Sequence, residues 1–163
     1  MNSQYFNKDQ GTITVSLQTP HSLSNVKNLV LSHIINNIFK ANNAAFKEQA
    51  NEQYQINLQD YSNIHGMTGF IATGKINHQT QLVEELAKRF IALTFSEPEI
   101  QREIKPYIDS LVSAKADSPD QVLFKQFAIK LKLPPAYWSD EQRITALKSI
   151  TLADVKAFHQ DML

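Results

Sequence analysis

The 163-residue chain contains no cysteine. This absence excludes disulfide bridges, thiolate nucleophiles and zinc sites with cysteine ligands together. It leaves the redox compartment open, because a domain without cysteine works equally in the cytoplasm or the periplasm. No apolar run approaches the roughly 18 residues of a membrane-spanning helix. The first twelve residues also lack the apolar core of a signal peptide, so we expect a protein that is not exported or a piece of a longer one.

An excess of charge of either sign is also missing. The 16 Lys and Arg residues balance 16 Asp and Glu residues, and no block of like charge occurs. The sequence therefore predicts no nucleic-acid partner and no membrane partner. Its 42% hydrophobic and 20% charged residues are typical of a globular domain. We predict a disordered polar tail over residues 1–10 and a single domain over residues 11–163.

Motifs that carry chemistry are scarce. The chain has no G-x-S-x-G, no P-loop and no G-x-G-x-x-G. No two histidines are four residues apart, and none lies in H-E-x-x-H or H-x-x-E-H. We therefore predict no catalytic residue, metal ligand or cofactor site in this chain. His33 is expected on the buried face of a helix, and His65 in a solvated turn.

Two strands are predicted between residues 54 and 74. Tyr54, Ile56 and Leu58 alternate with polar residues, and a second alternating run begins at Met67. The polar cluster between the runs predicts a hairpin. A bulge or a close approach of strands explains Gly69 and its neighbour Gly66 better than a phosphate cradle does. Residues 12–19 also alternate and predict a third strand with one buried face.

The rest of the chain has helical periodicity. Helices are expected at 26–38 with a cap from Ser22 or Ser24, at 41–51, at 82–91, from Ser96 onward, after Ser118, at 140–149 and from Thr151 onward. Pro106 predicts a kink or a one-turn break in the fourth of these. The order predicts an α+β two-layer sandwich, an antiparallel sheet of about three or more strands with helices on one face. Because three strands make a thin sheet, we expect a missing or partner-supplied strand and self-association through an exposed edge.

The closing phrase, Leu147 to Phe158, reads L-K-S-I-T-L-A-D-V-K-A-F. Together with the order of the elements from about Gly11 onward, it resembles a domain of the insulinase/pitrilysin zinc metallopeptidases, most of all the C-terminal non-catalytic domain. In that family an H-x-x-E-H motif in the N-terminal domain binds zinc, and the other domains complete a chamber around the peptide. The resemblance implies a fragment of a larger peptidase that carries the zinc elsewhere. It also implies two kinds of partner, the remaining domains or catalytic subunit and a peptide substrate, and it favours the periplasm.

The resemblance nominates two site residues. The family's last domain carries an arginine followed seven residues later by a tyrosine, and the pair stabilises the substrate carbonyl as its oxygen becomes negative. Tyr54 matches the tyrosine, and Lys47 occupies the arginine position. Lysine keeps the positive charge of the arginine but lacks its planar guanidinium, which can form two parallel hydrogen bonds. Gln53 replaces the glycine that usually precedes the tyrosine. A solvated lysine at a helix end and an ordinary strand tyrosine are the competing interpretations.

Two functions remain open from the sequence. The first is a non-catalytic, chamber-forming domain of an insulinase-like zinc metalloendopeptidase. The alternative is a binding or assembly module that has the same fold and no proteolytic role. An H-x-x-E-H motif elsewhere in the same gene or in an adjacent one would favour the first.

Overall fold

The computed structural model describes residues 9–18, 24–62, 67–113, 119–131 and 138–163. These residues form three strands and seven helices. In chain order the elements are β1 (Gln10–Gln18), α1 (Val26–Asn42), α2 (Ala44–Tyr54), β2 (Ile56–Ser62), β3 (Met67–Lys75), α3 (Gln79–Ile91), α4 (Glu97–Ser113), α5 (Pro119–Lys130), α6 (Asp140–Lys148) and α7 (Leu152–Met162). The predicted order of strands and helices is confirmed. The predicted tail lies almost wholly outside the described residues.

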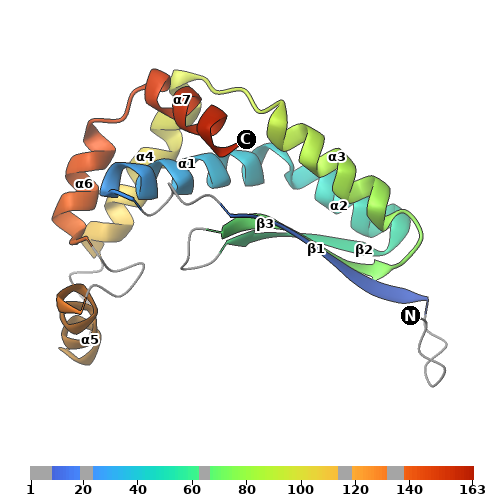
Figure 1. The fold of residues 1–163 in the computed structure, drawn as a ribbon, viewed down its shortest axis with the longest axis horizontal. Coiled ribbons are helices and arrows are strands. Elements are labelled where there is room, and N and C mark those ends of the chain that lie inside the picture. The colour runs from blue at the N-terminus through green and yellow to red at the C-terminus, as the bar shows by residue number, and fades with distance from the viewer. Residues whose placement is uncertain (1–8, 19–23, 63–66, 114–118, 132–137) are drawn as a thin grey trace.

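The sheet is antiparallel with the strand order β1-β3-β2, so the hairpin strand β3 is central. The side chains of β3 alternate between the two faces of the sheet. One face, the dry face, is buried against the helices, and the other, the wet face, is exposed to solvent. Phe70 and Ala72 are buried toward the helices, whereas Thr73 is exposed on the opposite face. Figure 1 shows α1, α2 and α3 on one side of the sheet, α4 and α6 beyond its end, and α5 apart from the other helices. The predicted α+β fold with helices on one face is therefore confirmed.

Gly69 allows β3 to approach β1 closely. It is paired with Ser16, and a Cβ atom at Gly69 would lie 1.9 Å from the carbonyl oxygen of Val15. No side chain fits at that distance, so only glycine preserves this part of the sheet. The close strand approach predicted for Gly69 is confirmed, while Gly66 lies outside the described residues.

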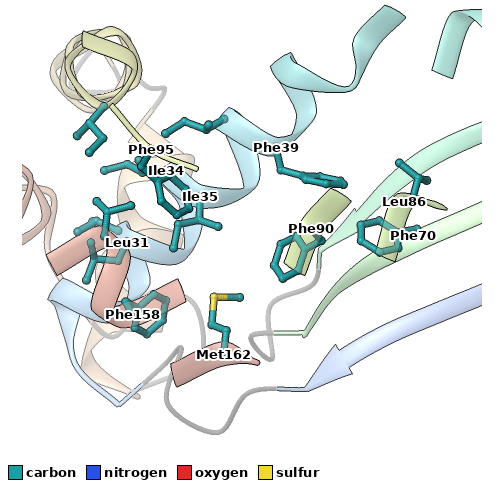
Figure 2. Close-up of a cluster of buried hydrophobic side chains, with 14 of the residues drawn as sticks. Leu31, Ile34, Ile35, Phe39, Phe70, Leu86, Phe90, Phe95, Phe158 and Met162 are labelled. Atoms are coloured by element: carbon teal, nitrogen blue, oxygen red, sulfur yellow. The ribbon is translucent and has the colours of Figure 1, made fainter. Parts of the chain in front are cut away.

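The core is organised around α1. Its residues Val30, Ile34, Ile35 and Ile38 are completely buried. At its C-terminal end Phe39 packs on Phe70 of β3 and Phe90 of α3, with ring centroids 5.3 Å apart in both pairs. Figure 2 shows this aromatic cluster beside Leu31, Ile34 and Ile35 of α1 and Phe158 and Met162 of α7. One continuous core therefore joins the sheet to the helices.

Two local predictions about α1 are wrong. The cap of α1 is neither Ser22 nor Ser24 but Asn25, whose side chain accepts a hydrogen bond of 2.8 Å from the Asn28 N–H. His33 is exposed, not buried, and its ring packs on Tyr107 at 4.1 Å. The periodicity was misleading there because His33 lies at the margin of the apolar stripe, where polar rings remain at the surface.

Pro106 does not interrupt its helix. α4 continues from Glu97 to Ser113 with Pro106 inside it, so the predicted one-turn break is absent. Proline removes one backbone donor, and the buried contacts of Ile100, Ile104 and Leu111 on either side of it hold the helix together. His65 lies outside the described residues.

The final helix begins with the capping box that the sequence predicts. The Asp154 carboxylate accepts hydrogen bonds from the Thr151 hydroxyl at 2.8 Å and from its backbone N–H at 3.0 Å. Lys27 of α1 donates a third, 2.8 Å bond to the same carboxylate. Lys27, followed by these bonds from Thr151, lowers the pKa of Asp154 from 3.8 to about 2. This cap therefore ties the last helix to the first long one.

We expect the Asp154 pair to make stability depend on pH. Because the folded pKa lies below the unfolded one, its contribution is complete above about pH 4 and disappears as the pH falls to about 2. The carboxylate is partly exposed, so Asp154→Asn should lower the free energy of unfolding at pH 7 by about 1 kcal/mol. Urea titrations at pH 7 and pH 3 should show this difference shrinking. Asp161→Asn, an exposed site on α7, is the control, and a difference independent of pH would contradict the assignment.

Candidate functional site

Lys47 projects from α2 toward the edge of the sheet. Its ammonium forms an ion pair with the Asp60 carboxylate of β2 and lies 5.9 Å from the centre of the Phe39 ring. The side chains of Lys47 and Asp60 are only 14% and 27% exposed. Lys47 is therefore not a solvated lysine at a helix end. It is a partly buried cation held by a carboxylate and by the face of an aromatic ring.

A hollow of about 440 Å³ opens beside this ion pair. It lies between α1, α2 and β2, and its lining residues are Lys40, Ala44, Lys47, Leu58, Gln59 and Asp60. A second hollow of about 170 Å³ shares Lys40 and Asp60 with the first and reaches inward to Phe70 and Phe90. The two together give the described surface a groove with charged groups at its mouth and aromatic rings at its base.

Tyr54 is the last residue of α2 and not the first residue of a strand, as its alternation with Ile56 and Leu58 predicted. The helix ends because Gln55 adopts the left-handed conformation, with φ of 55°, and its N–H donates to the Asn51 carbonyl at 3.0 Å. Gly74 of β3 makes room for this turn. A Cβ atom there would lie 2.2 Å from the Gln55 carbonyl oxygen.

The ring of Tyr54 packs on His78, with centroids 4.8 Å apart. His78 precedes α3 and also has a left-handed backbone, with φ of 73°. Its Nδ1 atom lies 3.0 Å from the Gln81 side-chain oxygen, which fixes the imidazole. The next residue, Gln79, is buried and donates from Nε2 to the carbonyls of Gly11 and Gly74 at 2.8 and 3.0 Å. Two strained residues thus frame Tyr54 at a corner where α2, β3 and α3 meet.

The structure places the two nominated residues on the same helix but in different surroundings. Lys47 faces Asp60 and the groove, whereas Tyr54 lies two turns later and faces His78. Tyr54 is 36% exposed, and within the described part of the chain its hydroxyl forms no hydrogen bond. The corner can therefore present a phenol donor to a bound molecule, and the groove can present a cation already compensated by a carboxylate.

Sequence reasoning missed both neighbours. Asp60 belongs to the polar cluster between the two alternating runs, which predicted a turn and not a strand, and His78 carried no motif. The alternation of Ile56 and Leu58, continued two residues further, would have placed Asp60 on the strand. No sequence signal pairs His78 with Tyr54, because the contact depends on how α3 returns to the end of α2.

No site for a metal ion forms among the residues described. Nowhere in them do three His, Asp or Glu side chains gather as a site would require. The described residues therefore offer no set of ligands for zinc, which the family resemblance places in another domain or subunit. The described helices also include none that is long and apolar enough to cross a membrane.

Comparison with known proteins identifies the fold. No family model and no curated protein matches the chain. Among solved structures, the crystal structure of pitrilysin is similar over 98% of this chain, with a TM-score of 0.77 and 21% sequence identity. The chain spans only 16% of the pitrilysin chain. It therefore has a pitrilysin-like fold of the kind that the sequence resemblance implied, and its place within a larger protein is a matter for proposal.

The partly buried pair of Lys47 and Asp60 should be energetically coupled. A double-mutant cycle with Lys47→Met and Asp60→Asn should give a coupling free energy of about 1–2 kcal/mol, because both side chains are shielded from water. The more exposed pair of Glu85 and Arg89 on α3 is a matched control and should give about 0.3–0.5 kcal/mol. Equal coupling in the two pairs would show that Lys47 behaves as an ordinary surface lysine.

Proposed function

We propose that this chain is a non-catalytic domain of an insulinase-like zinc metallopeptidase and forms part of its substrate chamber. The zinc site belongs to another domain or subunit. The observation that carries the proposal is the pitrilysin-like fold, which extends over 98% of this chain and corresponds to 16% of the pitrilysin chain. A piece of that size, whose sequence has no H-x-x-E-H motif, suits a wall of the chamber better than its catalytic centre.

Within this proposal Tyr54 contacts the substrate. Its phenol hydroxyl donates a hydrogen bond to the peptide carbonyl oxygen as that oxygen becomes negative. His78, held by Gln81, keeps the ring from turning away, so the donor is oriented before the substrate arrives. Preorganised donors of this kind stabilise a transition state more than a ground state.

Lys47 has a second, more distant part in the same proposal. Asp60 compensates most of its charge, so the ammonium is not a free counterpart of the family's arginine. Lys47 and Asp60 line the opening of the groove. There a peptide backbone or a carboxylate can displace water from the ion pair. Lysine in place of arginine then changes the local hydrogen bonding and keeps the positive charge.

An assembly module without proteolytic role is the second candidate. It is favoured by α5, where Leu123 is 72% exposed, Phe127 57% and Val122 42%. Exposed apolar side chains on one short helix are typical of a surface that another part of an assembly covers. A peptidase domain docked to its neighbours would cover the same helix, so activity distinguishes the two candidates.

The tyrosine assignment predicts a kinetic effect in the full protein. Tyr54→Phe should lower kcat by about 10- to 100-fold, because one donor to the developing oxyanion is lost, and should leave KM within about twofold. Steady-state kinetics with an unstructured peptide measure both values. Tyr107→Phe, which removes the hydroxyl of a tyrosine on α4, is the matched control. An unchanged kcat in Tyr54→Phe would leave Tyr54 with a structural role only.

The same assay tests the chain by itself. With added zinc and the same peptide it should not cleave, and turnover abolished by a chelator would overturn the proposed non-catalytic role. Absence of cleavage by the full protein would instead support the assembly module.

A further inference from the structure

The sheet has two outer edges, and they differ. β2 has α2 packed along it, and the ion pair of Asp60 with Lys47 lies at that edge. β1, at the other edge, is nine residues long and reads Q-G-T-I-T-V-S-L-Q, with no charged residue and no proline. Among the described residues no strand pairs with its outer side. Natural edge strands are usually protected by lysine, proline, a bulge or a covering element. β1 contains neither lysine nor proline.

The dry face of β1 is incompletely covered. Ile13, Val15 and Leu17 point toward the core and pack against it, but each remains only partly buried. The equivalent residues of the inner strand β3, Phe70 and Ala72, are 3% and 0% exposed. A further strand beside β1 would complete the burial that the central strand already has.

The sequence of β1 is complementary to itself when two copies run antiparallel about Thr14. Ile13 then lies opposite Val15 on the dry face, and Thr12 lies opposite Ser16 on the wet face. The terminal residues Gln10 and Gln18 also meet. Opposite residues keep the same parity, so Ile13 and Val15 face each other, Leu17 lies over Gly11, and the helices of both copies lie on the same side.

We propose that β1 is a self-association strand: two copies of this chain pair their β1 strands antiparallel around a two-fold axis at Thr14 and form one six-stranded sheet. A two-fold interface requires such self-complementarity. If a residue of one copy contacts a second residue of the other copy, the reverse contact also forms. The formal net charge of zero removes the long-range repulsion that would keep copies apart. This inference does not depend on the proposed peptidase role.

The strength of the association follows from its size. Pairing of a single strand buries less than the roughly 1,200–2,000 Å² of a stable interface. The dimer should therefore be reversible and should dissociate on dilution. Sedimentation velocity of the unmodified protein should show the dimer fraction rising across a hundredfold increase in concentration. A monomer throughout that range would overturn the inference.

Two matched substitutions locate the interface. Thr14 and Gln59 both pair with Ile71, one on each outer edge, and both are exposed on the wet face. Thr14→Lys places two like charges opposite each other at the axis and should weaken dimerisation at least tenfold. Gln59→Lys, at the edge away from the axis, should leave it unchanged. Circular dichroism confirms that both variants fold, and loss of the dimer in Gln59→Lys alone would place the interface at β2 and overturn the inference.

The absence of cysteine allows a second test that preserves the shape of the strand. Residues facing each other across antiparallel strands have Cα atoms about 4.5–5.5 Å apart, within the range that a disulfide spans. Under mild oxidation Thr14→Cys should form a covalent dimer, and Gln59→Cys should remain monomeric. A covalent dimer in Gln59→Cys and none in Thr14→Cys would contradict the proposed pairing, even if Thr14→Lys fails to fold.

Discussion

The contact on which the rest of the structure depends is the aromatic cluster of Phe39, Phe70 and Phe90. Each ring comes from a different element, and the centroids are 5.3 to 6.1 Å apart, the range in which aromatic pairs attract beyond simple burial. His159 of α7 extends the cluster: its ring packs on Phe90 at 5.3 Å, and its Nε2–H donates to the Phe90 carbonyl at 2.9 Å. Burial lowers the pKa of His159, which favours the neutral form of the imidazole. One cluster thus holds the sheet, the long first helix, α3 and the last helix together.

The candidate site and the bare edge both follow from this arrangement. With the helices fixed on one face, α2 must return along β2, and Lys47 then comes to lie over Phe39 and beside Asp60. In the same layering α3 contacts β1, with Gln79 donating to the Gly11 carbonyl, and no described strand pairs with the outer side of β1. A one-sided, three-stranded sheet therefore supplies a protected edge that carries charged groups and an unprotected edge that can add a strand.

Much of the fold could be predicted from the sequence, because local signals and tertiary packing agree over most of it. The alternation in β1, the capping box at Thr151 and the glycine at Gly69 each correspond to one physical requirement. The end of α2 could not be predicted, since Tyr54 continues the alternation of the strand while Gln55 adopts a left-handed turn that only Gly74 makes possible. At the candidate site, Lys47 and Tyr54 came from the resemblance to the peptidases, whereas Asp60 and His78 are tertiary neighbours that no local pattern reveals.

The role of the aromatic cluster is tested most directly by comparing Phe90→Ala with Phe127→Ala in equilibrium unfolding. Phe90 is 2% exposed and touches three other rings of the cluster, whereas Phe127 on α5 is 57% exposed. If the cluster holds the layers together, Phe90→Ala should lower the free energy of unfolding by about 3–5 kcal/mol. Phe127→Ala should lower it by less than about 0.5 kcal/mol. Equal losses in the two variants would contradict this account of the fold.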